Sequence, residues 1–170
     1  MALISDKLNS QLDDIIGKCF AINRMLDRGM SLLKVRWKLI HTSNTMHPKV
    51  AHAYPAEKFA DGISDYQAER GNETVYPATP IGNKEYNTPL DFFMDYYNEN
   101  IELENMIKDA IDESVEEGDN TTTKFLNDLL MRLSPYTALS QDLIDLFSKC
   151  DNDAFKMQML DFEIDDYINV

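Results

Sequence analysis

The chain has 170 residues, of which 44% are hydrophobic, with only six glycines and six prolines. This length is typical of one domain, and so few breakers favour long helices over short strands. The formal net charge of −14 argues against a protein built mainly to hold phosphates. No secretory leader, membrane-spanning stretch or CxxC pair is present, which predicts a cytoplasmic protein with no membrane association and with Cys19 and Cys150 reduced.

A single apolar stripe runs through the first 43 residues and repeats at steps of three or four. Such a stripe predicts one long helix over residues 6–43, with residues 1–20 as an N-terminal helical extension. Gly17 and Gly29 weaken this helix but do not break its phase. The stripe consists of Leu8, Leu12, Ile15, Cys19, Ile22, Leu26, Met30, Leu33, Trp37 and Ile40.

A break is expected at residues 42–48, followed by a second helix that begins at Pro48 or Pro55 and ends at Gly71. Residues 72–88 are expected to form a long connection, because proline, glycine and asparagine, which favour turns, occur close together there at positions 77, 80, 82 and 83. The buried face of the second helix is expected to consist of Phe59, Ile63 and Tyr66.

The third helix has the clearest start, because Thr88 is a good N-cap and Pro89 suits the first helical position. It is expected to end at Gly118, and a fourth helix follows that Pro135 must kink or interrupt. A short acidic helix is expected within residues 151–170. The fold class is therefore all-α, a single four-helix bundle with a long crossover between its second and third helices and a short C-terminal helix.

An acidic ridge on the second helix is the sharpest local feature. Glu57, Asp61, Asp65 and Glu69 recur every four residues, and like charges at that spacing repel one another. Solvent, a basic neighbour or a cation can offset the repulsion, and carboxylates suit hard or borderline cations such as Fe²⁺. The ridge is thus either a solvated face or a metal site.

The three histidines, His41, His47 and His52, form no i,i+4 pair and no ExxH motif. Di-iron bundles normally carry ExxH on two helices, so a standard centre inside one subunit is not expected. Each histidine alone is interpreted as a surface or break residue.

Positive charge gathers on the first helix. Residues 1–49 carry eight basic and four acidic side chains, whereas the rest of the chain carries 8 basic and 26 acidic ones. One arc of this helix faces away from the apolar stripe and is the candidate DNA-facing surface, or else a solvated face that pairs with acidic neighbours. Its members are Arg24, Arg28, Lys34 and Lys38.

Several short segments, taken in order, resemble Dps-family miniferritins of the ferritin-like superfamily. Asp65-x-x-x-Glu69-Arg70-Gly71 resembles the end of their second helix, and Trp37 resembles the Trp of their His-Trp pair. The segments 77–79, 88–90 and 118–122 resemble their loop, third-helix start and next turn. The resemblance covers about residues 20–150 and implies twelve identical subunits in a hollow shell that stores iron, and in many members coats DNA.

The resemblance also implies an iron-oxidation centre shared between two subunits, and this chain matches it only in part. Asp65 and Glu69 fit two ligand positions, and Asp61 is a third candidate ligand. Three other ligand positions fall on Arg36, Val50 and Tyr54, so the centre is interpreted as degenerate.

The leading functional hypothesis is a miniferritin subunit for iron storage and protection against oxidative stress. The family's pattern implies a homo-oligomer, a dodecamer, and whether iron oxidation is catalysed is left open. One alternative is a DNA-protecting shell with little iron oxidation. Another is a helical bundle that binds a protein partner.

Overall fold

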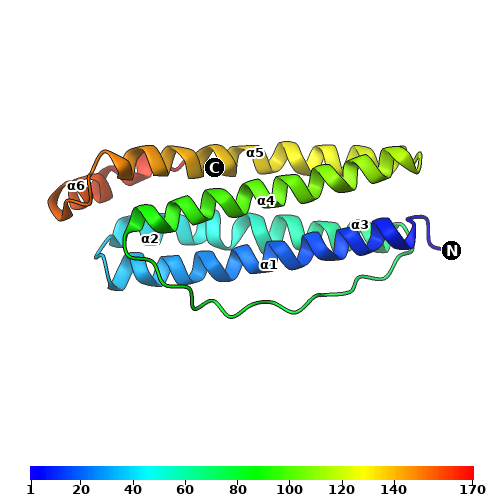
Figure 1. Cartoon of the computed structure of the whole chain (residues 1–170), viewed down its shortest axis with the longest axis horizontal. Coiled ribbons are helices and arrows are strands. Elements are labelled where there is room, and N and C mark those ends of the chain that lie inside the picture. Colours follow the sequence, from blue (N-terminus) through cyan, green and yellow to red (C-terminus); the bar gives the residue numbers. More distant parts are fainter.

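The structure is a computed structural model that describes all 170 residues, and it contains helices and no strands. Four long helical segments run side by side, and a short C-terminal helix lies at one end (Figure 1). The predicted all-α bundle is confirmed. None of the helices combines the length and the apolar character that a membrane crossing requires.

The first helix, α1, spans Asp6–Val35 and begins where the Ser5 hydroxyl accepts a bond from the Leu8 amide. The prediction that it runs to residue 43 is wrong. The chain leaves the helix at residues 36–39, where Lys38 has a φ of 59° and the Leu39 amide donates to the Leu33 carbonyl. The residue with a positive φ that ends a helix is usually glycine. Here it is lysine, so the end of α1 could not be predicted from the sequence.

The second long segment is continuous helix, so the predicted break at residues 42–48 is also wrong. It begins with α2 (Ile40–Met46), passes through two π-helical stretches, η1 (His47–Ala51) and η2 (Ala53–Ala60), and ends as α3 (Asp61–Glu69). Both Pro48 and Pro55 lie inside it rather than at its start. The predicted end at Gly71 is confirmed by a φ of 74° there.

Residues 72–88 form the predicted crossover, which passes along the outside of α1 (Figure 1). Glu85 fixes its far end, because its two carboxylate oxygens pair with Arg28 and Arg36. Pro77 fixes the near end by packing closely against Gly17.

Helix α1 and the second long segment form one helical hairpin. The second hairpin consists of α4 (Pro89–Glu116) and α5 (Asn120–Ser148). As predicted, Thr88 caps α4, and it does so in a reciprocal capping box with Asp91. Of the two predicted effects of Pro135, a kink or an interruption of the fourth helix, the interruption is wrong, because α5 runs through this residue. Pro135 is exposed, so solvent can hydrate the carbonyl that its missing N–H leaves free.

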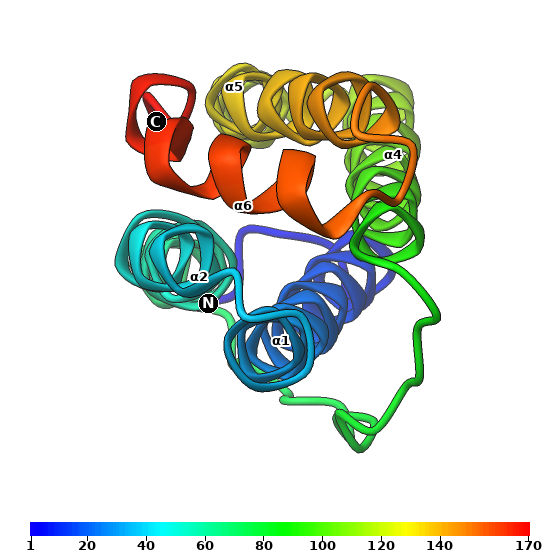
Figure 2. The ribbon, with the colours of Figure 1, turned by 90° about the vertical axis from the view of Figure 1, so that its left-hand side faces the viewer.

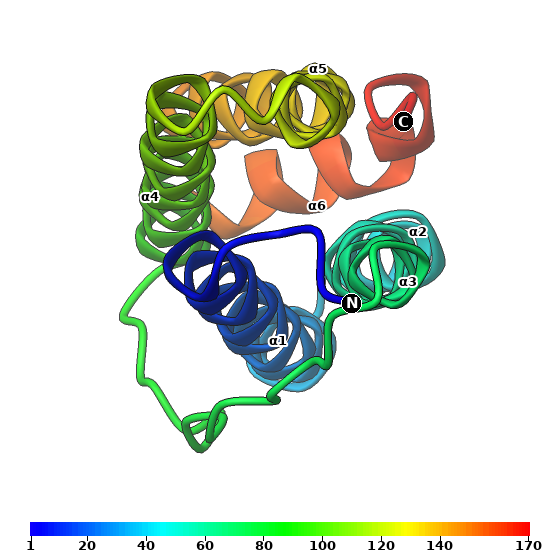
Figure 3. The same cartoon turned by 90° about the vertical axis from the view of Figure 1, so that its right-hand side faces the viewer.

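The C-terminal helix α6 spans Ala154–Glu163, and a single 3-10 turn, η3 (Ile164–Asp166), follows it. Seen along the bundle, α6 lies in the space between α5 and α2 (Figures 2 and 3). Its helical neighbours are α2 and η3. The expected short C-terminal helix is confirmed, and it lies within the expected residues 151–170.

One apolar core of 38 buried residues joins the two hairpins and includes the predicted stripe residue Cys19 and the predicted Phe59, Ile63 and Tyr66. Its middle contains a polar cluster. The Tyr54 hydroxyl donates to the Asn100 side chain over 2.6 Å, and the Tyr54 ring stacks on Tyr136 with centroids 4.1 Å apart. Di-iron bundles build their metal sites in the core from carboxylates and histidines, whereas the polar side chains of this cluster are tyrosines and an asparagine.

Candidate metal centre

Two histidines face each other on the second helical segment because that segment is π-helical. Residues five apart in an α-helix point about 140° away from each other, since each residue turns the chain by about 100°. A π-helix instead bonds each amide to the carbonyl five residues earlier, as the His52 amide does with the His47 carbonyl. The Nε2 atoms of His47 and His52 consequently lie 3.1 Å apart.

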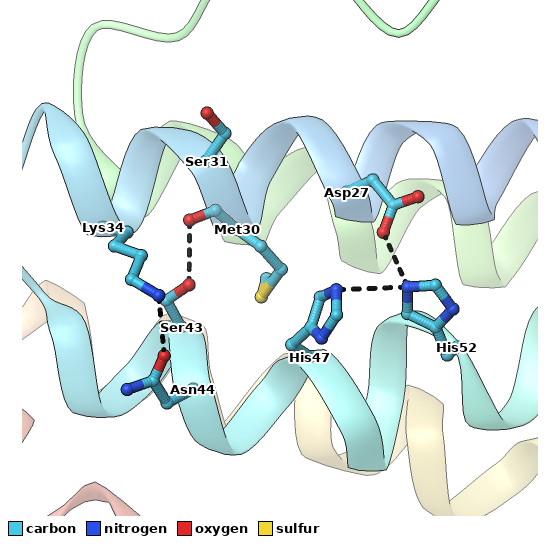
Figure 4. Close-up of a pocket in the computed structure, with 8 residues that line it drawn as sticks. All are labelled: Asp27, Met30, Ser31, Lys34, Ser43, Asn44, His47 and His52. Carbon is cyan, nitrogen blue, oxygen red and sulfur yellow. Dashed lines mark hydrogen bonds and ion pairs between the residues drawn. The ribbon is translucent and has the colours of Figure 1, made fainter.

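Asp27 completes the cluster from α1. Its Oδ1 lies 3.3 Å from Nε2 of His52, and all three side chains point toward one another across the gap between α1 and the second segment (Figure 4). One ligand atom from each of the three residues lies within 4.8 Å of the others, and no other group of His, Cys, Asp or Glu in the chain meets this condition.

Two buried contacts hold the two helices at this spacing. The Asn23 side chain, one turn before Asp27, donates to the Ala51 carbonyl over 2.6 Å. The Ser43 hydroxyl donates to the Met30 carbonyl over 2.9 Å. Because one of these bonds lies on each side of Asp27 along α1, the helices cannot drift apart there without losing buried hydrogen bonds.

The cluster opens into a cavity of about 400 Å³ between α1 and α2. Lys34 stands at its other end, where its ammonium donates to the Asn44 side chain over 3.1 Å (Figure 4). The side chains that line the cavity are Asp27, Met30, Ser31, Lys34, Ser43, Asn44, His47 and His52.

The donor set fits a transition-metal ion. Two ligand atoms at about 2.1 Å from a metal and at right angles to it lie about 3 Å apart, close to the observed 3.1 Å and 3.3 Å separations. Two imidazoles and one carboxylate are typical of mononuclear Fe²⁺ sites and also of Zn²⁺ sites. If a metal bound here, three protein ligands would leave coordination positions for water or a further ligand.

The metal ligands predicted from sequence lie elsewhere. Asp61, Asp65 and Glu69 are exposed on the outer face of α3, and none of them joins the cluster of Asp27, His47 and His52. Their role in metal binding stays a prediction. Arg36, which stands at one ligand position of the family pattern, turns away to pair with Glu85 and to donate to the Tyr86 carbonyl.

The four candidate DNA-facing residues have different surroundings. Arg28 is engaged with the crossover through Glu85, and Arg24 lies 3.8 Å from Asp27. Lys34 lines the metal cavity, and Lys38 is exposed in the turn after α1. DNA binding through this set stays a prediction.

Neither a protein-family model nor a curated protein sequence matches the chain. Solved structures do match. An open-pore ferritin from the archaeon Archaeoglobus fulgidus superposes with a TM-score of 0.88 at 21% identity, over 99% of this chain and 100% of that one. The chain has the ferritin-like fold.

Two engineered ferritins superpose over the same extent of this ferritin-like chain. A closed form of the Archaeoglobus fulgidus ferritin gives a TM-score of 0.87 at 21% identity, with 98% of each chain covered. A humanized archaeal ferritin gives 0.83 at 19% identity, again with 98% of each chain covered. Because the match spans nearly the whole length, it includes the crossover and the C-terminal helix.

Proposed function

We propose that this chain is the subunit of a ferritin-like iron-binding shell, and that Fe²⁺ binds at Asp27, His47 and His52. The observation that supports this most directly is the two-histidine, one-carboxylate cluster, held at ligand spacing by helices that are tied together on both sides. The ferritin-like fold supports the same function, since proteins named ferritins share it over its full length.

Assembly into a homo-oligomer is the second part of the proposal. The C-terminal helix exposes an apolar stripe, with Phe155 73%, Met159 49% and Phe162 69% exposed at spacings of four and three residues. Contiguous exposed apolar side chains on one helix face are typical of protein interfaces. We expect a dodecamer, and light scattering after size exclusion should give about twelve times the chain mass of 19.6 kDa. A stable monomer would have no enclosed shell interior, and storage of iron inside a shell would then be impossible.

We also propose that the acidic ridge of a second subunit completes the coordination. The cluster lies on the surface rather than in the core, so its open side can face another copy. The ridge offers exposed carboxylates, at Asp61, Asp65 and Glu69. Their hard oxygen donors would fill coordination positions that the three ligands of the cluster leave open. Protection against oxidative stress follows if such a site removes free Fe²⁺ from solution.

The test is Fe²⁺ titration under anaerobic conditions, with Co²⁺ as a spectroscopically visible substitute. His52→Ala should weaken binding by more than about 100-fold, since losing even an outer partner of a metal ligand costs about 10–100-fold. His41→Ala is the matched control, because His41 is exposed and outside the cluster. Equal affinity in both variants would show that the metal binds elsewhere.

The ridge is tested separately. Asp65→Ala should leave a Co²⁺ site on the unassembled subunit intact and weaken metal binding only in the assembled shell. A loss of equal size in both states would mean that Asp65 acts within its own subunit.

A further inference from the structure

The acidic C-terminal helix contacts the bundle through one buried carboxylate. Asp161 is 2% exposed, and its side chain accepts from the backbone amides of His41 and Thr42 over 3.1 and 2.7 Å. It also accepts from the Thr42 hydroxyl over 2.6 Å. Asp161 therefore satisfies the first free amides of α2 from a position 120 residues away in the chain.

No local side chain does this for α2. Its N-cap residue is Leu39, which offers no side-chain acceptor, whereas α1, α4, α5 and α6 each have a capping Ser, Thr or Asp. The free amides at a helix start need acceptors, and a negative charge there is favourable. The start of α2 thus depends on the docking of α6.

Further contacts extend the same attachment along the second segment. Gln158 donates to the carbonyls of Trp37 and Lys38, in the turn before α2. Thr45 bonds to Asp165, and the Lys49 ammonium donates to the Ile168 carbonyl over 2.9 Å. The C-terminal segment therefore follows α2 from the turn that precedes it to the residues that flank His47.

We propose that Asp161 is a positioning residue for the metal centre, through which the C-terminal segment sets the position of His47. This inference rests on the proposed metal site. Helix α2 is about two turns long at roughly 3.6 residues per turn. It leads directly from the amides bound by Asp161 to His47, and its other anchor is the bond from Ser43 to α1. Release of α6 frees the start of α2, and His47 moves relative to Asp27.

The coupling acts in both directions. If docked α6 favours the arrangement that binds metal, then bound metal favours docked α6 by the same factor. The chain contains its own reporter, because its only tryptophan, Trp37, packs partly buried beside Gln158.

The experiment compares Co²⁺ affinity and Co²⁺ absorption in the full-length protein, its Asp161→Ala variant and an Asp166→Ala control. Asp166 carries the same charge, is exposed, and makes no side-chain bond. We expect Asp161→Ala to weaken Co²⁺ binding by about tenfold or more, the scale of losing an outer partner, to change the absorption spectrum, and to shift Trp37 emission to longer wavelength. Asp166→Ala should behave as the wild type.

A second variant keeps the test decisive if Asp161→Ala does not fold. Thr42→Val removes one of the three donors and leaves both amide bonds, so a smaller shift in the same direction is expected. A variant with red-shifted Trp37 emission but an unchanged Co²⁺ affinity and spectrum would overturn the inference and leave the metal site standing. Failure of the wild type to bind Co²⁺ or Fe²⁺ would overturn both.

Discussion

The ring of Phe92 lies directly against the backbone of Gly29, where the start of α4 packs on α1. A methyl group at residue 29 would come within 2.1 Å of two ring atoms, so only glycine permits this approach. The residue that looked like a weak point in the first helix is therefore what allows the two hairpins to meet.

Gly29→Ala should destabilise the protein even though alanine favours helix. The gain in helix propensity is about 1 kcal/mol, whereas forcing an extra carbon into a packed core costs about 1–3 kcal/mol or more. Gly62→Ala is the control, because that helical position has nothing within 4 Å, and it should raise stability. Urea midpoints of both variants decide the matter, and two shifts of the same sign would contradict the packing argument.

The buried thiol of Cys19 should make the protein sensitive to alkali. Burial raises the pKa of Cys19 to about 12, and burial also raises the pKa of Tyr54. In the unfolded chain a thiol ionises near about 8.5, so above that pH the unfolded state binds fewer protons and stability falls. The contribution of Cys19 is complete below about pH 8.5 and is lost progressively as the pH rises toward 12.

Urea midpoints measured between pH 8 and 10.5 check this. Cys19→Ala should start from a lower stability, because it leaves a cavity, but should decline less steeply with pH. Identical slopes would assign the alkaline loss to other groups. In the folded wild type, Cys19 should also resist alkylation at pH 8 and react only after unfolding.

Glu85→Gln should loosen the crossover without unfolding the bundle. Hydrogen bonding to Arg36 is the main cause that lowers the pKa of Glu85, and the charge of Arg28 adds to it. A lowered pKa means that the contact is present at neutral pH and is lost as the pH falls through the folded-state value. Limited proteolysis within residues 72–88 should be faster in this variant. Glu73→Gln, an exposed crossover glutamate with no ion pair, should be cut at the wild-type rate.

Metal binding at the cluster should compete with protons. Ligand imidazoles bind a metal in their unprotonated form, so Co²⁺ binding should release protons. Calorimetry in buffers of different ionisation enthalpy counts those protons. His47→Ala should lower the count, and a count that is the same in this variant would place the ion away from His47.

The helix signals with strong local chemistry were predictable from sequence. The Thr88 hydroxyl and the fixed φ of Pro89 act within the first turn of α4, and Gly71 and Gly118 adopt positive φ angles that few other residues tolerate. The core-facing stripe was predictable for the same reason as far as Leu33, since its period is a property of the helix. Beyond the end of α1 it fails, because Trp37 is only partly buried and Ile40 is 45% exposed.

The metal cluster was not predictable, because it depends on π-helical geometry and on tertiary placement. A search for i,i+3 and i,i+4 pairs passes over His47 and His52, whose spacing of five is unproductive in an α-helix. The signal that the sequence does contain is the pair Pro48 and Pro55. Proline has no N–H to donate to the helix, so it favours a local change in the hydrogen-bond register. Asp27 carries no local signal, because its role is set by where α1 meets the second segment.

The π-helical stretch also bears on how such a site can arise. A turn closed by a bond over five residues holds one residue more than a turn closed over four, while the helix still enters and leaves the bundle at the same places. A helix can thus accommodate an inserted residue in its middle. The insertion changes which side chains share a face, but only near the π-helical turn. In this bundle, whose apolar interior contains a cluster of tyrosines and an asparagine, a surface histidine pair can then appear through an insertion, with the core sequence left untouched.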